Sequence, residues 1–255
     1  MRNKAEVRIK IDKQHEKSEL SIHVDESKIL FEHYGDINNA RKIVLFCHGF
    51  PGSSRLNLLC DHLKNNSISL VEINYRGDKK SEGKFSFLGS IKDIRSVASY
   101  LKEKYKVPLH ALGYSMGGFY VTNLINKEPD IFDQITLLNP VVDTMSLFSN
   151  KLLMDQLWEH AKNILSLKPT EDYKEEISMV IGKLNPLGFA ENLKSKITII
   201  QSTKDEVLAP ELAKKFYNVL TCKKKYQEVI NATHELLGDE KELIDAILDT
   251  SLCEN

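Results

Sequence analysis

The alternation of short apolar runs with helix-like segments after residue 42 restricts this chain to few folds. The expected strands are residues 43–47, 69–74, 109–113, 134–138, 196–200 and 226–230. The expected helices are residues 54–64, 91–105, 116–125, 210–220 and 240–248. Strands that alternate with helices form a mostly parallel sheet covered by helices on both faces. The sequence therefore predicts an α/β fold, with strands such as 43–47 buried on both sides.

Two parts of the chain depart from this alternation. At the start, residues 6–11, 19–24 and 28–34 are short strand-like stretches separated by polar turns, and they predict antiparallel strands at one edge of the sheet. Between Pro140 and Lys194 the pattern is helical without a strand signal, over a length that is unusual for a connection. We therefore expect a core of residues 1–140 and 195–255, with residues 141–194 inserted as a small helical cap.

A serine lies in the most informative motif, Gly113–Tyr114–Ser115–Met116–Gly117. The motif stands between a predicted strand and a predicted helix, which is the context of a nucleophile elbow. Glycines allow the tight turn, and the helix N-terminus favours developing negative charge. Ser115 is therefore the candidate nucleophile.

A serine nucleophile needs a base whose pKa is near neutral, and histidine meets this need. His234 lies in a polar loop just after the strand 226–230, at the sheet edge where sites of open α/β folds lie. The acid that orients the histidine should also follow a strand. Asp205 fits best, while its neighbour Glu206 and the earlier Asp143 are alternatives.

These motifs resemble those of the α/β-hydrolase superfamily from about residue 42 onward. They include His48–Gly49–Phe50–Pro51–Gly52–Ser53, Asn74–Tyr75–Arg76–Gly77, Ser81–Glu82–Gly83, and the order Ser115, Asp205, His234. In finer detail, the Arg-Gly and Ser-Glu-Gly stretches with a short cap are similar to cinnamoyl and feruloyl esterases and monoacylglycerol lipases. Many relatives have Arg-Gly-His-Gly where this chain has Arg76–Gly77–Asp78–Lys79, which affects the expected loop shape but not the triad.

The resemblance implies a serine hydrolase that cleaves carboxylic esters through an acyl-enzyme, without a metal or organic cofactor. The oxyanion would be held by the backbone N–H groups of Met116, directly after the nucleophile, and of Phe50, because Pro51 has no N–H. His48 is expected to support this loop structurally. The cap would shape the acyl pocket, and its candidate lining residues are Leu153, Met154, Leu157 and Trp158.

Other functions remain open at this point. A peptidase of the prolyl-oligopeptidase type shares the catalytic half but usually carries a large propeller domain, for which this chain has no room. A thioesterase, a lipase or a non-catalytic binding protein on the same scaffold are further alternatives, although an intact triad argues against the last. The expected substrate is a small-molecule ester.

Composition excludes several classes of partner. The formal net charge of −1 gives no electrostatic reason to expect nucleic acid, and no apolar run is long enough to span a membrane. The four cysteines, Cys47, Cys60, Cys222 and Cys253, show no spacing typical of zinc sites or disulfides. The first twelve residues contain no apolar block, so no signal peptide is expected and a cytoplasmic location is the default. Nothing in the sequence indicates the oligomeric state.

Overall fold

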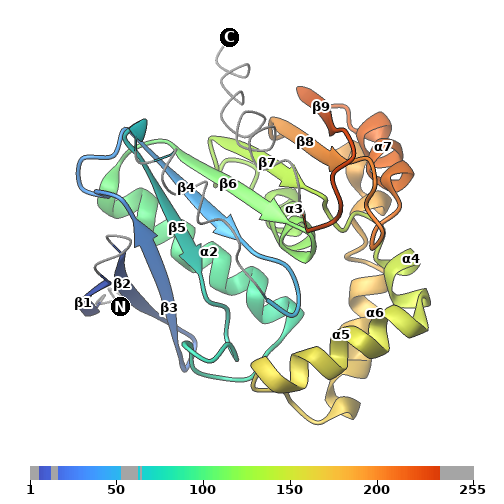
Figure 1. Ribbon diagram of the computed structural model, residues 1–255, viewed down its shortest axis with the longest axis horizontal. Helices are drawn as coiled ribbons and strands as arrows, with labels where there is room; N and C mark the ends of the chain where they lie inside the picture. Colours follow the sequence, from blue (N-terminus) through green and yellow to red (C-terminus); the bar gives the residue numbers. More distant parts are fainter. Residues whose placement is uncertain (1–5, 13–16, 53–62, 64, 236–255) are drawn as a thin grey trace.

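The computed structural model describes residues 6–12, 17–52, 63 and 65–235. They form a nine-stranded sheet in the order β1-β2-β3-β5-β4-β6-β7-β8-β9 (Figure 1). The strands are β1 (Glu6–Asp12), β2 (Lys17–Val24), β3 (Ser27–Tyr34), β4 (Lys42–Cys47), β5 (Ile68–Ile73), β6 (Leu109–Tyr114), β7 (Gln134–Leu138), β8 (Ile197–Ser202) and β9 (Lys224–Val229). The first three strands and the β3–β5 pair are antiparallel, and all other pairs are parallel. The mostly parallel sheet with an antiparallel edge is thus confirmed.

Three helices cover one face of this sheet: α2 (Phe87–Tyr105), α3 (Met116–Lys127) and α7 (Pro210–Val219). α2 starts at Phe87 rather than at the expected residue 91, because the Ser86 side chain caps it by accepting a hydrogen bond from Gly89 N. The helix expected at 54–64 lies outside the described residues apart from Leu63, and the helix expected at 240–248 lies wholly outside them.

The central strands are buried on both faces, as their continuous apolar runs predict. In β4, Ile43 and Leu45 pack with the helices on one face, whereas Val44 and Phe46 belong to a second apolar cluster on the other. The chain order reverses at β4, which has β5 on one side and β6 on the other. Ligand sites of open α/β sheets lie at the carboxyl ends of strands beside such a reversal.

Residues 141–194, called the cap segment below, contain no strand, although Leu165 forms an isolated antiparallel bridge with Asp78. Their helices are α4 (Thr144–Ser149), α5 (Lys151–Ile164), α6 (Lys174–Ile181) and the short 3₁₀ turns η1 (Thr170–Tyr173), η2 (Pro186–Gly188) and η3 (Ala190–Asn192). In Figure 1 α4, α5 and α6 lie beside the end of the sheet rather than over its face. Polar contacts join them to the core. Glu176 of α6 accepts hydrogen bonds from Ser86 Oγ and Leu88 N, and Ser166 N donates to the Gly77 carbonyl. That this segment is a separate cap unit stays a prediction.

Candidate active site

Ser115 lies in a sharp turn between β6 and α3. Its φ of 53° and ψ of −119° are values that a non-glycine residue adopts only where the surroundings enforce them. The turn also brings the start of α3 close to the end of β4, since a Cβ on Gly117 would come within 1.8 Å of the Cys47 carbonyl oxygen. A larger residue at 117 would therefore push β4 and α3 apart. This geometry explains the glycine at position 117 and places Ser115 at the carboxyl end of β6.

Ser115, His234 and Asp205 come together from the carboxyl ends of three strands. Ser115 Oγ lies 3.1 Å from His234 Nε2, and His234 Nδ1 lies 2.8 Å from Asp205 Oδ2. Their exposed fractions are 9 %, 6 % and 8 %, respectively. With Nδ1–H donating to Asp205, Nε2 can accept the proton of the Ser115 hydroxyl. The arrangement is that of a nucleophile, its base and the acid that orients the base.

Asp205 is held in one orientation by four hydrogen bonds. Its Oδ1 accepts from the backbone N–H groups of Val207 and Leu208, and its Oδ2 accepts from Gln201 Nε2 as well as from His234. Such bonds fix the oxygen that faces the imidazole. The sequence analysis did not identify Gln201 as a partner of Asp205. Its position in β8, four residues before Asp205, was the only feature of the sequence that could have indicated this role.

The two alternative acids occupy other positions. Asp143 Oδ1 accepts from Ser146 N, so it caps α4, and it also accepts from Asn185 Nδ2. Glu206 Oε2 accepts from the backbone N–H of His234, not from its ring. Of the three candidates, Asp205 is thus the one whose carboxylate contacts the His234 imidazole.

The loop after β4 approaches Ser115 from the other side. Gly49 and Phe50 line the same cavity as Ser115 and Met116, and a Cβ on Gly49 would lie 3.0 Å from the Ser115 Cβ. His48 is buried behind this loop, where its Nδ1 lies 2.8 Å from the Gly49 carbonyl oxygen and its ring packs against Tyr75. His48 does not line the cavity.

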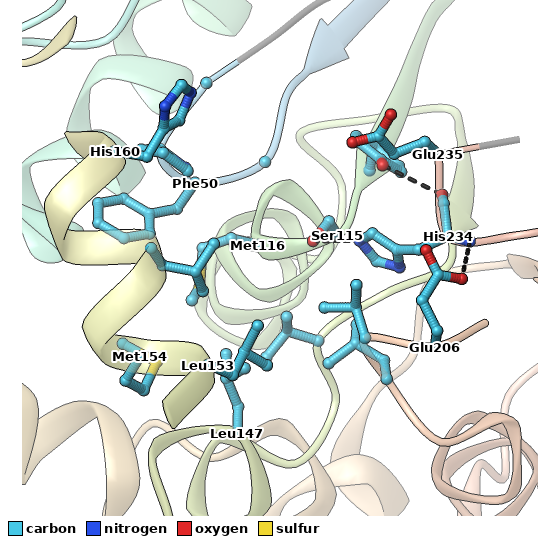
Figure 2. Close-up of a pocket in the computed structure, with 18 residues that line it drawn as sticks. Phe50, Ser115, Met116, Leu147, Leu153, Met154, His160, Glu206, His234 and Glu235 are labelled. Carbon is cyan, nitrogen blue, oxygen red and sulfur yellow. Dashed lines mark hydrogen bonds between the residues drawn. The ribbon is translucent and has the colours of Figure 1, made fainter. Parts of the chain in front are cut away.

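The cavity has a volume of about 410 Å³, within the range of small-molecule sites. Figure 2 shows Ser115 and His234 at its centre, with Leu147, Leu153 and Met154 on the cap helices. Its polar lining beyond the triad includes His160, Glu206 and Glu235, and its apolar lining comprises Phe50, Met116, Val141, Leu147, Leu153, Met154, Leu157, Val207 and Leu208.

Trp158 is the exception among the expected lining residues. Leu153, Leu157 and His160 follow the i, i+4, i+7 spacing of one helix face and line the cavity. Trp158 lies on the adjacent face of α5, where its ring packs against Phe50 at 5.2 Å and Tyr173 at 5.1 Å between centroids. Trp158 therefore packs against Phe50, which lines the cavity, but does not line it itself. Its neighbour Leu157 does line the cavity, and the sequence did not distinguish these two adjacent positions.

Within the described ranges, no side-chain cluster could bind a metal, and the buried Cys47 is not a competing nucleophile. Burial raises the pKa of the Cys47 thiol far above its usual value, so this cysteine stays protonated in the core. No cluster of three or more His, Cys, Asp or Glu side chains within the described ranges could hold a metal ion. In that same part of the chain, no helix is long and apolar enough to cross a membrane.

Comparison with solved structures finds the same fold at low sequence identity. Est1E from Butyrivibrio proteoclasticus, with ferulic acid bound, has 18 % identity and a TM-score of 0.74, covering 91 % of this chain and 97 % of its own. A monoacylglycerol lipase from Paleococcus ferrophilus has 17 % identity and a TM-score of 0.68, with 89 % and 99 % covered. Acetyl xylan esterase 1 from Thermoanaerobacterium sp. has 15 % identity and a TM-score of 0.69, with 98 % and 88 % covered.

At these sequence identities, the similarity shows a shared fold. A comparison with curated protein sequences found no significant match. A family model described as "Serine aminopeptidase, S33" matches residues 38–179, which is more than half of the 255 residues and includes Ser115. The chain therefore belongs to this serine aminopeptidase S33 family, and its fold is that of the α/β-hydrolases.

Proposed function

We propose that this protein is a serine hydrolase that cleaves carboxylic esters through an acyl-enzyme intermediate. The observation that carries the proposal is the chain of contacts from Ser115 Oγ to His234 Nε2 and from His234 Nδ1 to Asp205 Oδ2 at the bottom of a cavity. A hydroxyl in contact with a base whose other nitrogen is held by a carboxylate is the arrangement of an activated nucleophile.

In the proposed reaction, Ser115 Oγ attacks the ester carbonyl carbon while His234 Nε2 takes the hydroxyl proton. The negative charge on the carbonyl oxygen is stabilised by the backbone N–H groups of Phe50 and Met116. His234 then gives its proton to the departing alcohol, which leaves Ser115 acylated. Water, activated by His234 in the same way, hydrolyses this ester and restores the enzyme.

The lining of the cavity supports an apolar acyl group. Leu147, Leu153 and Leu157 of α4 and α5 line the site together with Val207 and Leu208 of the core. Burial of apolar acyl carbons between these side chains is favourable by about 0.8 kcal/mol per methylene. A feruloyl or cinnamoyl ester is a more specific candidate, supported by the similar fold of Est1E, whose structure contains ferulic acid.

The test is hydrolysis of p-nitrophenyl esters of increasing acyl length and of a feruloyl ester, by the wild type and by Ser115→Ala. We expect turnover by the wild type and a loss of at least 10³-fold in kcat in the variant, because the nucleophile is removed. Equal turnover by both proteins, or none by a folded wild type on any ester, would contradict the proposal.

The family supplies a second candidate function, aminopeptidase activity. The same triad could attack the amide bond after an N-terminal residue, with His234 protonating the leaving amine. Aminoacyl p-nitroanilides distinguish the two functions. Faster turnover of these amides than of every ester tested would favour the peptidase.

A further inference from the structure

The main chain of His234 is held by side chains from three neighbouring strands. Its carbonyl oxygen accepts hydrogen bonds from Tyr114 Oη at 3.1 Å and from Asn139 Nδ2 at 3.0 Å. Its N–H donates to Glu206 Oε2 at 3.1 Å. Tyr114 ends β6, Asn139 follows β7 and Glu206 follows β8. Both polar main-chain atoms of the base are therefore fixed by side chains and not by the ladder of β9.

Asn139 can donate in only one direction. It is fully buried, and its Oδ1 accepts from Ser202 N at 2.7 Å, so the amide cannot flip without leaving that N–H unpaired. Its Nδ2 consequently points toward Ser202 Oγ and the His234 carbonyl. The residue has φ of 42°, in the left-handed region that asparagine tolerates better than most residues. Backbone conformation and side-chain bonds thus both suit asparagine here.

Tyr114 connects the base to the nucleophile directly. It directly precedes Ser115 in the chain, so its hydrogen bond joins the loop of His234 to the residue next to the nucleophile. Its ring lies 5.4 Å from the His234 ring between centroids, with 33° between the planes. The tyrosine therefore contacts the histidine through both its ring and its hydroxyl.

We infer that Asn139 and Tyr114 are positioning residues, which set the distance between His234 Nε2 and Ser115 Oγ through the His234 carbonyl. The inference rests on the proposed serine hydrolase function. A small displacement of a catalytic group is costly to rate, since about 1 Å can lower it 10²-fold. Glu206 bonds the opposite side of the same residue but is exposed, so its contribution should be smaller.

The test compares Tyr114→Phe and Asn139→Gly with Ser202→Ala. Phenylalanine retains the ring and removes only the hydroxyl. Glycine retains the left-handed backbone but removes the whole side chain, including the oxygen that accepts from Ser202 N. Ser202→Ala also removes a hydrogen bond of Asn139 but leaves the bonds to His234 in place. We expect kcat to fall about 5- to 10-fold in each of the first two variants, with KM within about twofold, and less than twofold in Ser202→Ala.

A second readout follows the imidazole itself. The proton on His234 Nδ1 is shared with Asp205, and its NMR resonance should shift or broaden in Tyr114→Phe and Asn139→Gly but not in Ser202→Ala. Unchanged kcat and an unchanged resonance in Tyr114→Phe would overturn the inference. An equal loss in Ser202→Ala and Asn139→Gly would show that Asn139 only braces β7 against β8. If the wild type hydrolyses no ester, the proposed function fails, and the resonance still decides whether these residues hold the histidine.

Discussion

The two sides of the cavity are held in place by different interactions. On the core side, directional hydrogen bonds fix the reacting groups: Asp205 accepts four, and His234 is bonded at both ring nitrogens and both main-chain polar atoms. On the cap side, the wall includes Leu147, Leu153 and Leu157, whose side chains form no hydrogen bonds. The polar bonds between the cap segment and the core include those of Glu176 and Ser166, neither of which lines the cavity.

The core side therefore fixes the positions of the reacting groups, whereas the cap side determines the shape of the cavity. Hydrogen bonds specify angle and distance, whereas an apolar wall tolerates changes of side chain if its volume is nearly kept. Substitutions on the core side should therefore lower turnover with little loss of stability. Substitutions in the cap segment should change stability or acyl preference, while the chemistry at Ser115 is retained.

The largest effect is expected for Asp205→Asn. The N–H groups of Val207 and Leu208 both donate to Oδ1, so an amide there would keep its oxygen toward them and turn its NH₂ toward His234. His234 Nδ1 would then accept a hydrogen bond, and Nε2 would carry the proton and could not receive the one from Ser115. We expect kcat to fall about 10⁴-fold with unchanged folding by circular dichroism.

Asp143→Asn is the matched control for this experiment. Asparagine caps helices as well as aspartate does, so α4 should be retained and kcat should stay within about twofold. A large loss of turnover in Asp143→Asn, with near-normal turnover in Asp205→Asn, would reverse the assignment of the orienting acid.

The same contrast explains how much could be predicted from the sequence. Ser115, His234 and Asp205 follow apolar strands closely, and parallel strands bring their carboxyl ends to one edge, so their proximity follows from chain order. Gln201 and Asn139 act through side-chain bonds between neighbouring strands, and no pattern along the chain indicates such bonds. The sequence predicts that Trp158 lines the cavity, which it does not. Helical periodicity shows that α5 is half-buried, but not which of its apolar residues face the core and which face the cavity.

The next largest effect is expected for Glu176→Ala in the cap segment. Glu176 is 7 % exposed, and its carboxylate accepts from Ser86 Oγ and Leu88 N, both at 2.7 Å, at the N-terminus of α2. Its removal leaves a buried N–H unpaired and an unopposed helix dipole. We expect the free energy of unfolding to fall by about 2 kcal/mol, measured in urea through the fluorescence of Trp158, the single tryptophan. Glu175→Ala, an exposed site on the same helix, should change it by less than about 0.5 kcal/mol, and equal losses in both variants would contradict the role of Glu176.

The last effect is expected from acid; it is similar in size to that of Glu176→Ala and should arise in the core. His110 of β6 is buried with its Nε2 on Thr136 Oγ1, and burial, aided by Lys42, lowers its pKa from 6.5 to about 3. The unfolded chain binds this proton below about pH 6.5 and the folded chain does not, so stability is complete above that pH and is lost as pH falls through it. Between pH 7 and pH 5 the wild type should lose about 2 kcal/mol more than His110→Gln, measured by urea unfolding at each pH. His160 of the cap segment is exposed, so His160→Gln should leave the dependence of the unfolding free energy on pH as in the wild type. If the wild type and both variants showed the same dependence on pH, the buried His110 would not be the source of the acid sensitivity.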